Sequence, residues 1–398
     1  MALEARPVYR ENRATPLGHW SLPAVVEPRP ASVRALKLYL FLFFASVGLT
    51  EPFLNLYLRR LGFSGAEIGA LAAIQPGVAA LAPFLWTAWA DATGRARALF
   101  RWNSWLAGFC FIPVLVRPSA GSLAAALTVF ALLKTPLVPL ANSLAFQALG
   151  PNREGYGRIR LWGSVGYVLA AVTGGALVDR IGVAPVLGGV VVLLGGCGAV
   201  ASGSLGRGAP APPAPLRAGL AALLRQRAFR TFLAATFLAR LSAGPYNTFF
   251  TIQLDALGIS QRVAGWAWAV GVLCEVAVMA AWPLLAARAP AVRLLFLSVL
   301  AHPVRWWLYA EVTHPVGLLT IQLLHGFTFG LFYLASVQIV DETVREDLRA
   351  TGQGLYAAGV FGVAGLSGNF LAGHLFDRIG LPALYRLSAI VGFAAALL

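Results

Sequence analysis

The sequence predicts an all-α membrane protein with twelve transmembrane helices in two pseudo-symmetric six-helix bundles. Three observations predict this fold class. The composition is too apolar for a water-soluble protein, apolar runs of membrane-spanning length recur along the chain, and two motifs of the first half recur in the second half.

The amino-acid composition excludes an ordinary water-soluble protein. Of the 398 residues, 58% are apolar and 12% are charged, and this charged share is about half that of a soluble protein. A soluble globule of this length needs more polar side chains to cover its surface, whereas a bilayer accommodates an apolar one. The three cysteines, Cys110, Cys197 and Cys274, lie in apolar runs without metal-ligand spacing, so we expect no metal and no cofactor.

Apolar runs long enough to cross a bilayer occur twelve times, since a spanning helix needs about 20 residues. Several contain a proline, which should kink the helix. The runs lie at 36–58, 66–89, 99–117, 121–148, 158–178, 183–205, 229–253, 263–287, 292–311, 315–340, 351–376 and 381–398.

The distribution of positive charge predicts the orientation in the membrane. The formal net charge is +15, which in a soluble protein can indicate nucleic-acid binding. With both termini in the cytoplasm, 21 Lys and Arg side chains fall in the tail and inner loops and seven in the outer loops, as the positive-inside rule requires. We therefore expect no nucleic-acid partner and a multi-pass protein of a prokaryotic plasma (inner) membrane, with both termini cytoplasmic.

Composition also divides the chain into four segments. Residues 1–34 form a basic tail rich in proline, and residues 206–228 form a cytoplasmic linker rich in proline, alanine and arginine. The linker separates an N-terminal six-helix bundle, residues 35–205, from a C-terminal six-helix bundle, residues 229–398.

The two predicted bundles carry related motifs. LRRLGFSGAEIG at 58–69 corresponds to LDALGISQRVAG at 254–265, and LVDRIG at 177–182 corresponds to LFDRIG at 375–380. The offsets of 196 and 198 residues are nearly equal. They indicate an internal duplication, and parallel repeats around a site at the bilayer midplane are typical of many secondary transporters.

The loop WADATGRARALF at 89–100 resembles the signature loop between helices 2 and 3 of the major facilitator superfamily. The resemblance places Asp91, Gly94, Arg95 and Arg97 in the matching positions and implies a conformational latch, although the leading glycine of the family is absent. A turn that carries positive-inside charge is the alternative interpretation.

A second motif, YGRIRLWGSVGY at 156–167, is similar to the start of helix 5 in the lactose permease branch of that superfamily. This branch includes oligosaccharide and nucleoside proton symporters and phenylpropionate permeases. In its sugar-transporting members an arginine and a downstream aromatic residue bind the substrate. The resemblance implies this role for Arg160 and Tyr167.

Ionisable side chains inside the predicted spans are further candidates, since a charge in hydrocarbon costs several kcal/mol unless it is paired or hydrated. In the lactose permease branch, helices 8, 9 and 10 supply a glutamate, an arginine and a histidine, which implies these roles for Glu275, Arg305 and His325. We expect Glu275 and Arg305 to form an ion pair whose separation lets Glu275 take a proton. A permanent structural ion pair is the alternative, and for His325 the alternative is a hydrogen-bonded core histidine.

The chain departs from the sugar permease at two charged positions. Asn142 stands where that permease has an acid on helix 4, and Thr328 stands where it has the acid that carries the proton. Its proton route therefore does not transfer to this chain, and we expect coupling to depend on Glu275 or Glu51.

The predicted cavity contains four cations against two acids, an excess that an anionic substrate would balance. Arginine suits a carboxylate because its fork binds both oxygens. We expect fewer than half of eight nearby aromatic residues to line the cavity, namely Trp162, Tyr167, Tyr246, Phe249, Phe250, Trp306, Phe329 and Tyr333. The predicted substrate-binding residues are Arg160, Tyr167, Lys134, Asn142, Arg240, Asn247 and Trp306, and the predicted proton-coupling residues are Glu275, Arg305, His325 and Glu51.

Together these features predict a monomeric secondary active transporter that moves a small organic solute with protons by alternating access. An organic anion, with an aromatic acid favoured, is the first substrate class. A sugar or nucleoside proton symporter and a drug-efflux antiporter are the alternatives. An enzyme is not expected, because neither HExxH nor GxSxG occurs in the sequence.

Overall fold

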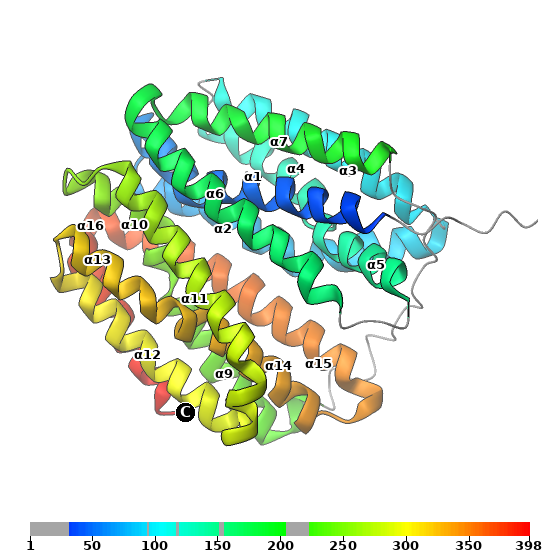
Figure 1. Ribbon diagram of the computed structural model, residues 1–398. Helices are drawn as coiled ribbons and strands as arrows, with labels where there is room; N and C mark the ends of the chain where they lie inside the picture. The colour runs from blue at the N-terminus through cyan, green and yellow to red at the C-terminus, as the bar shows by residue number, and fades with distance from the viewer. Residues whose placement is uncertain (1–31, 94, 117–118, 151–154, 204–222) are drawn as a thin grey trace, which may run out of the picture.

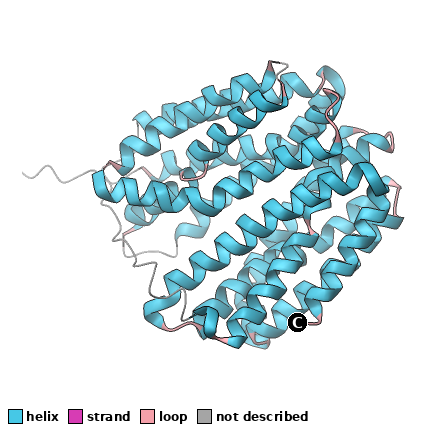
Figure 2. Ribbon diagram, turned by 180° about the vertical axis from the view of Figure 1, so that it is seen from behind, coloured by secondary structure: helices cyan, strands magenta, loops and turns pink. Residues whose placement is uncertain are grey.

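The computed structural model describes residues 32–93, 95–116, 119–150, 155–203 and 223–398, and every regular element in these ranges is a helix (Figure 2). Most of the predicted basic tail and of the predicted linker lies outside the described residues. The boundaries of these two segments therefore stay predictions.

The helices of the first half coincide with the six apolar runs of the sequence. The fourth run is divided at Thr135 and Pro136, because a proline lacks the N–H group that would continue the helix. The helices are α1 (Val33–Arg60), α2 (Gly65–Thr93), α3 (Ala96–Phe111) with the 3-10 turn η1 (Ile112–Leu115), α4 (Ala120–Lys134), α5 (Leu137–Leu149), α6 (Tyr156–Ile181) and α7 (Val183–Gly203).

The helices of the second half follow the other six runs, with more interruptions. Two of the interruptions, η4 and η6, are π-helical turns, which often occur at functional sites. The elements are α9 (Arg227–Ser242), α10 (Gly244–Ala256), α11 (Gln261–Arg288), α12 (Ala291–Glu311), α13 (Pro315–Ile321), η3 (Gln322–Leu324), η4 (Gly326–Leu331), α14 (Phe332–Thr343), η5 (Glu346–Leu348), α15 (Arg349–Tyr356), η6 (Ala357–Ala364) and α16 (Gly365–Ala396).

Within the described residues, ten helical segments are long and apolar enough to cross a membrane. This number differs from the twelve predicted spans for two reasons. The seventh run forms two shorter helices, α9 and α10, which meet at Ala243. The last two runs are joined in α16, where Gly380 (φ 72°) adopts a left-handed conformation that favours glycine and turns the chain between them.

The helices form two bundles that lie side by side, α1–α7 in one and α9–α16 in the other (Figure 1). In the first bundle α1 packs against α6 and α7, and in the second α12 packs against α16. Between the bundles α2 packs along α16, and α6 packs along α11. The site therefore has to be sought along these two inter-bundle contacts.

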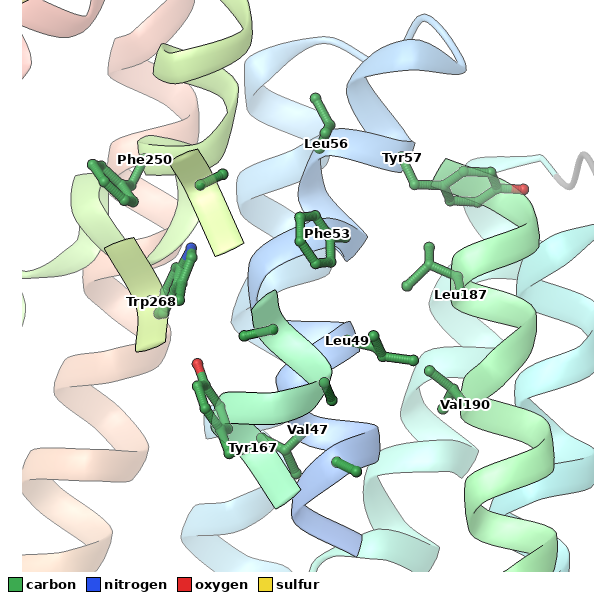
Figure 3. Close-up of a cluster of buried hydrophobic side chains, with 14 of the residues drawn as sticks. Val47, Leu49, Phe53, Leu56, Tyr57, Tyr167, Leu187, Val190, Phe250 and Trp268 are labelled. Carbon is green, nitrogen blue, oxygen red and sulfur yellow. The ribbon is translucent and has the colours of Figure 1, made fainter. Parts of the chain in front are cut away.

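Both bundles contribute to one buried apolar cluster (Figure 3). Leu49 and Phe53 of α1 pack in it with Leu187 of α7, and Trp268 of α11 belongs to the same cluster. Close packing rather than the hydrophobic effect holds helices together in a bilayer. The cluster fixes Tyr167 of α6, whose side chain is 4% exposed, at the boundary between the bundles.

Candidate functional site

A cavity of about 460 Å³ lies between the two bundles, a size typical of small-molecule sites. Residues of α1, α2, α4 and α6 line it on one side, and residues of α9, α10, α11, η4, η6 and α16 line it on the other. The ionisable side chains in this lining, apart from tyrosine, are Glu51, Arg160, Arg240, Glu275 and His325.

The structure brings most of the predicted site residues together. Arg160, Tyr167, Arg240 and Asn247 of the predicted substrate-binding set line the cavity. Glu51, Glu275 and His325 of the predicted proton-coupling set line it too. Four predicted residues lie outside the lining, namely Lys134, Asn142, Trp306 and Arg305.

Two arginines face the cavity from opposite bundles. The guanidinium carbon of Arg160 lies 4.1 Å from the ring centroid of Phe44, and that of Arg240 lies 5.5 Å from the ring centroid of Phe361. Across the described part of the chain, neither guanidinium forms an ion pair with a carboxylate. The buried Nε of Arg240 also has no hydrogen-bond partner among these residues. Both groups are therefore available to an anionic ligand.

The partner of Glu275 is a histidine rather than the expected arginine. The Glu275 carboxylate lies 2.6 Å from Nε2 of His325, and both side chains line the cavity. Arg305 does not form the predicted ion pair with Glu275. It is 1% exposed and donates hydrogen bonds to Thr328 (2.7 Å) and Gln322 (3.0 Å).

Arg305 is held behind the cavity wall by neutral groups. Its guanidinium carbon lies 4.2 Å from the ring centroid of Tyr246, whose hydroxyl donates a hydrogen bond to Gln322 (3.1 Å). Thr328 belongs to the π-helical turn η4. A hydroxyl and an amide, together with a cation–π contact, thus take the place of a carboxylate partner.

Glu51 of α1 and Lys134 of α4 have different environments. Glu51 lines the cavity and accepts a hydrogen bond from the Tyr167 hydroxyl (3.1 Å). Lys134 is 6% exposed, and its Nζ lies 5.2 Å and 5.8 Å from the ring centroids of Phe130 and Phe43. Lys134 therefore lies outside the cavity lining in this conformation, and its role in substrate binding stays a prediction.

Asn142 and Trp306 are also removed from the predicted substrate site. Asn142 lies on α5, outside the cavity lining. Trp306 is 1% exposed and donates a hydrogen bond from Nε1 to the Ser242 hydroxyl (2.9 Å), which is a packing role. Of the eight aromatic candidates, Tyr167 and Phe329 line the cavity, so the expectation of fewer than half is confirmed.

The charge balance of the cavity differs from the prediction. Two carboxylates and two guanidinium groups line it, while Lys134 and Arg305 are buried behind its walls. The predicted excess of positive charge is therefore not in the lining itself, because two of the four cations are held by aromatic and neutral polar groups.

Sequence reasoning missed a set of amides in the lining. Asn55 donates a hydrogen bond to the carbonyl of Thr248 (3.0 Å), and Asn369 donates one to the carbonyl of Ala72 (3.0 Å). Gln75 lines the cavity as well. These amides carry no charge, and their position in apolar helices, where polar side chains often join neighbouring helices, was the available signal.

The predicted latch lies partly outside the described residues. Gly94 is not among them, and Asp91 is described only by its backbone. Arg95 is exposed at the start of α3, and Arg97 borders a small pocket between α3 and α5. The latch role of this loop stays a prediction.

With the geometry established, the chain can be compared with known proteins. The model of the MFS_1 like family matches residues 33–387, which is most of the sequence. The chain belongs to this family. Its internal duplication and twelve helical runs are those of the major facilitator superfamily, as the resemblance implied.

Similar proteins cover nearly the whole chain. A maltose permease of Geobacillus stearothermophilus is 29% identical over 91% of this chain and 93% of its own length. The protein named "Probable 3-phenylpropionic acid transporter" of Escherichia coli is 27% identical over 92% of this chain and 97% of its own. The crystal structure of the nucleoside transporter NupG matches with a TM-score of 0.81 at 18% identity, covering 92% of this chain and 97% of that chain.

These comparisons confirm the fold class and the general function. A crystal structure of the peptide transporter POT shares the fold as well, with a TM-score of 0.71 at 11% identity, covering 92% of this chain and 93% of that one. As a member of this family, the chain is a multi-pass membrane transporter that moves a small-molecule solute, and it is not an enzyme.

Proposed function

We propose that this transporter carries a small organic anion, with an aromatic carboxylate favoured, and that protons drive the transport. The observation that carries the proposal is the pair of cavity-lining arginines, Arg160 and Arg240, which have no carboxylate partner in the described chain. The relative named "Probable 3-phenylpropionic acid transporter" supports the same substrate class.

The arginines suit a carboxylate because a guanidinium fork donates two parallel hydrogen bonds to its oxygens. Arg160 belongs to one bundle and Arg240 to the other. A carboxylate between them would join the bundles and favour the conformation in which both arginines reach it. Phe44 and Phe361, beneath the two guanidinium groups, would orient the forks.

Proton coupling follows from competition for the same arginines. The carboxylate of Glu275 lines the same cavity as Arg160 and Arg240. When the cavity is empty, its negative charge partly balances these cations. A proton taken up by the Glu275–His325 pair would remove that balance and leave the guanidinium groups to the substrate anion. The proton and the anion would then bind together and be released together.

Three further features belong to the proposal. Both termini face the cytoplasm of a prokaryotic cell, since the basic loops then lie inside. One chain is sufficient for transport, because the cavity is built from a single chain. The loop at Asp91, Gly94, Arg95 and Arg97 acts as a latch in another conformation, as the superfamily resemblance implies.

A sugar is the second candidate, and a specific observation favours it. Four amide side chains, Asn55, Gln75, Asn247 and Asn369, line the cavity and could hydrogen-bond to hydroxyl groups. The maltose permease at 29% identity supports this alternative.

A thermal-shift screen of the purified transporter tests the proposal, since a ligand that binds the folded state stabilises it by mass action. The panel contains 3-phenylpropionate and other aromatic acids, maltose, and uridine. We expect the aromatic acids to raise the melting temperature and Arg160→Ala to abolish that rise. A rise with maltose or uridine and with none of the acids would overturn the anion proposal.

A further inference from the structure

We propose that the two repeated Asp-Arg-Ile-Gly turns form a paired latch that holds one end of the transporter closed. This closed end is where α1 ends at Arg60, α2 begins at Gly65, α6 ends at Ile181 and α11 begins at Gln261. The latch would control the opening of this end of the transporter, so the proposal does not depend on which solute class is transported.

The first acid of the latch joins α6 to α11. Asp179, in the last turn of α6, accepts hydrogen bonds from the backbone N–H groups of Gln261 (2.9 Å) and Arg262 (3.0 Å). It also accepts a hydrogen bond from the hydroxyl of Ser260 (2.5 Å). A carboxylate of the N-terminal bundle thus caps a helix of the C-terminal bundle.

The second acid makes the equivalent contact in the opposite direction. Asp377 of α16 accepts hydrogen bonds from the backbone N–H groups of Gly65 and Ala66, both at 3.1 Å. These residues are the first of α2. A carboxylate of the C-terminal bundle therefore caps a helix of the N-terminal bundle, and the internal duplication generates both contacts.

Each cap stabilises the closed end, and each can also be broken when the bundles separate. The first N–H groups of a helix have no partner within the helix and carry a partial positive charge, so a carboxylate binds them favourably. Asp179 and Asp377 are both exposed to solvent. Water can replace each carboxylate when the bundles separate, so the latch can open without leaving a buried group unpaired.

Glycines just inside the caps let the same helices meet backbone to backbone. Gly175 of α6 faces Gly265 of α11, and Gly69 of α2 faces Gly373 of α16. A Cβ atom at any of these positions would clash with the backbone of the opposite helix. The caps therefore lie next to two close contacts that join the bundles at this end.

Spin-label distance measurement tests the latch directly. Val116 and Val316 are both 69% exposed and lie at the closed end, one in each bundle. They can be replaced by labelled cysteines after Cys110, Cys197 and Cys274 have been changed to serine. Double electron–electron resonance then gives the distribution of distances between the two labels across the closed end, in detergent or in lipid nanodiscs.

We expect the double variant Asp179→Ala/Asp377→Ala to populate a second, longer distance. Removing a helix cap shifts an equilibrium by about fivefold, so each single variant should raise the ratio of open to closed molecules by about that factor. The double variant should raise it by about 25-fold, since the two caps have no shared partner and their free-energy contributions add. Asparagine substitutions should have smaller effects because an amide keeps one accepting oxygen.

Glu311→Ala is the matched control. Glu311 is also an exposed acid at this end, but its partner Arg386 (2.9 Å) belongs to the same bundle. Its loss should leave the distance distribution unchanged. Size-exclusion profiles identify variants that misfold, and for those the asparagine variants supply the comparison. A double variant with the wild-type distribution, or a Glu311→Ala distribution as broad as that of the double variant, would overturn the proposal.

Discussion

The two bundles contribute different chemistry to the same cavity. In the first bundle, Arg160 extends over a single ring, and Glu51 accepts one hydrogen bond from a tyrosine. In the second bundle, Glu275 pairs with His325, while Arg305 is enclosed in a network of hydroxyl, amide and aromatic groups. In the second bundle the ionisable groups other than Arg240 are therefore connected to polar partners, whereas the cavity-facing groups of the first bundle have few.

This difference suggests a division of work that the duplication alone does not explain. A cation that faces the cavity and has no carboxylate partner can bind a substrate anion that enters the cavity. A connected acid and histidine beside a fixed positive charge are suited to take and release a proton. We therefore assign substrate binding first to Arg160 and proton transfer first to Glu275, with Arg240 as the contribution of the second bundle to binding.

The largest effect is expected from Arg160→Ala. Loss of a bidentate, charge-assisted contact costs about 3 kcal/mol, or about 100-fold in the Kd of an anionic substrate. Titration calorimetry on purified protein measures it. The control is Arg158→Ala, which removes an exposed arginine from the same turn of α6 and should leave the Kd unchanged. If both variants bind alike, the first bundle does not supply the binding cation.

Glu275→Gln should separate proton coupling from solute movement. Without a titratable group at this position, proteoliposomes should lose accumulation driven by a pH gradient and keep exchange of internal for external solute. Glu51→Gln removes the acid of the first bundle and should retain accumulation. If Glu51→Gln alone lost coupling, proton transfer would belong to the first bundle, and our assignment to Glu275 would be wrong.

Arg240→Lys tests the shared part of the site. Lysine keeps the positive charge but loses the planar fork, so we expect about tenfold weaker binding of a carboxylate. The Kd of Arg240→Ala should increase further. Equal affinities of the lysine variant and the wild type would mean that Arg240 acts through charge alone and makes no bidentate contact.

The smallest effect on transport is expected from Thr328→Val. It removes the hydroxyl that accepts a hydrogen bond from Arg305, and leaving a buried donor unpaired costs about 1–3 kcal/mol of stability. The melting temperature should fall, while the substrate Kd changes by less than about threefold. Thr320→Val, which removes an exposed hydroxyl of α13, is the control and should leave both unchanged.

The fold could be predicted from the sequence because a bilayer imposes simple rules on the chain. Backbone polar groups must be satisfied within each span, so long apolar runs have to be helices. The positions of the twelve runs followed from that rule. The helix breaks were only partly predictable. The division at Ala243 lies beside Pro245, a proline of the seventh run that was expected to kink the helix. The π-helical turn at Gly326–Leu331 contains no proline that would have predicted it.

The site was only partly predictable for a related reason. Charged residues in the spans pointed to the cavity, and Arg160, Glu275 and His325 do line it. The partners of those charges could not be derived, because helix rotation decides them. Arg305 turns to a threonine and a glutamine instead of Glu275, and aromatic rings enclose Lys134. The spacing of residues in the sequence predicts neither set of partners.

The affinities of a matched acid and amide test the central claim most directly. Calorimetry compares 3-phenylpropionate with 3-phenylpropionamide, which has the same ring and chain but no charge, in the wild type and in Arg160→Ala. Our account expects the wild type to bind the acid at least about tenfold more tightly than the amide, and the variant to lose that preference. Equal affinity of the wild type for both compounds, or an acid preference that survives in Arg160→Ala, would contradict it.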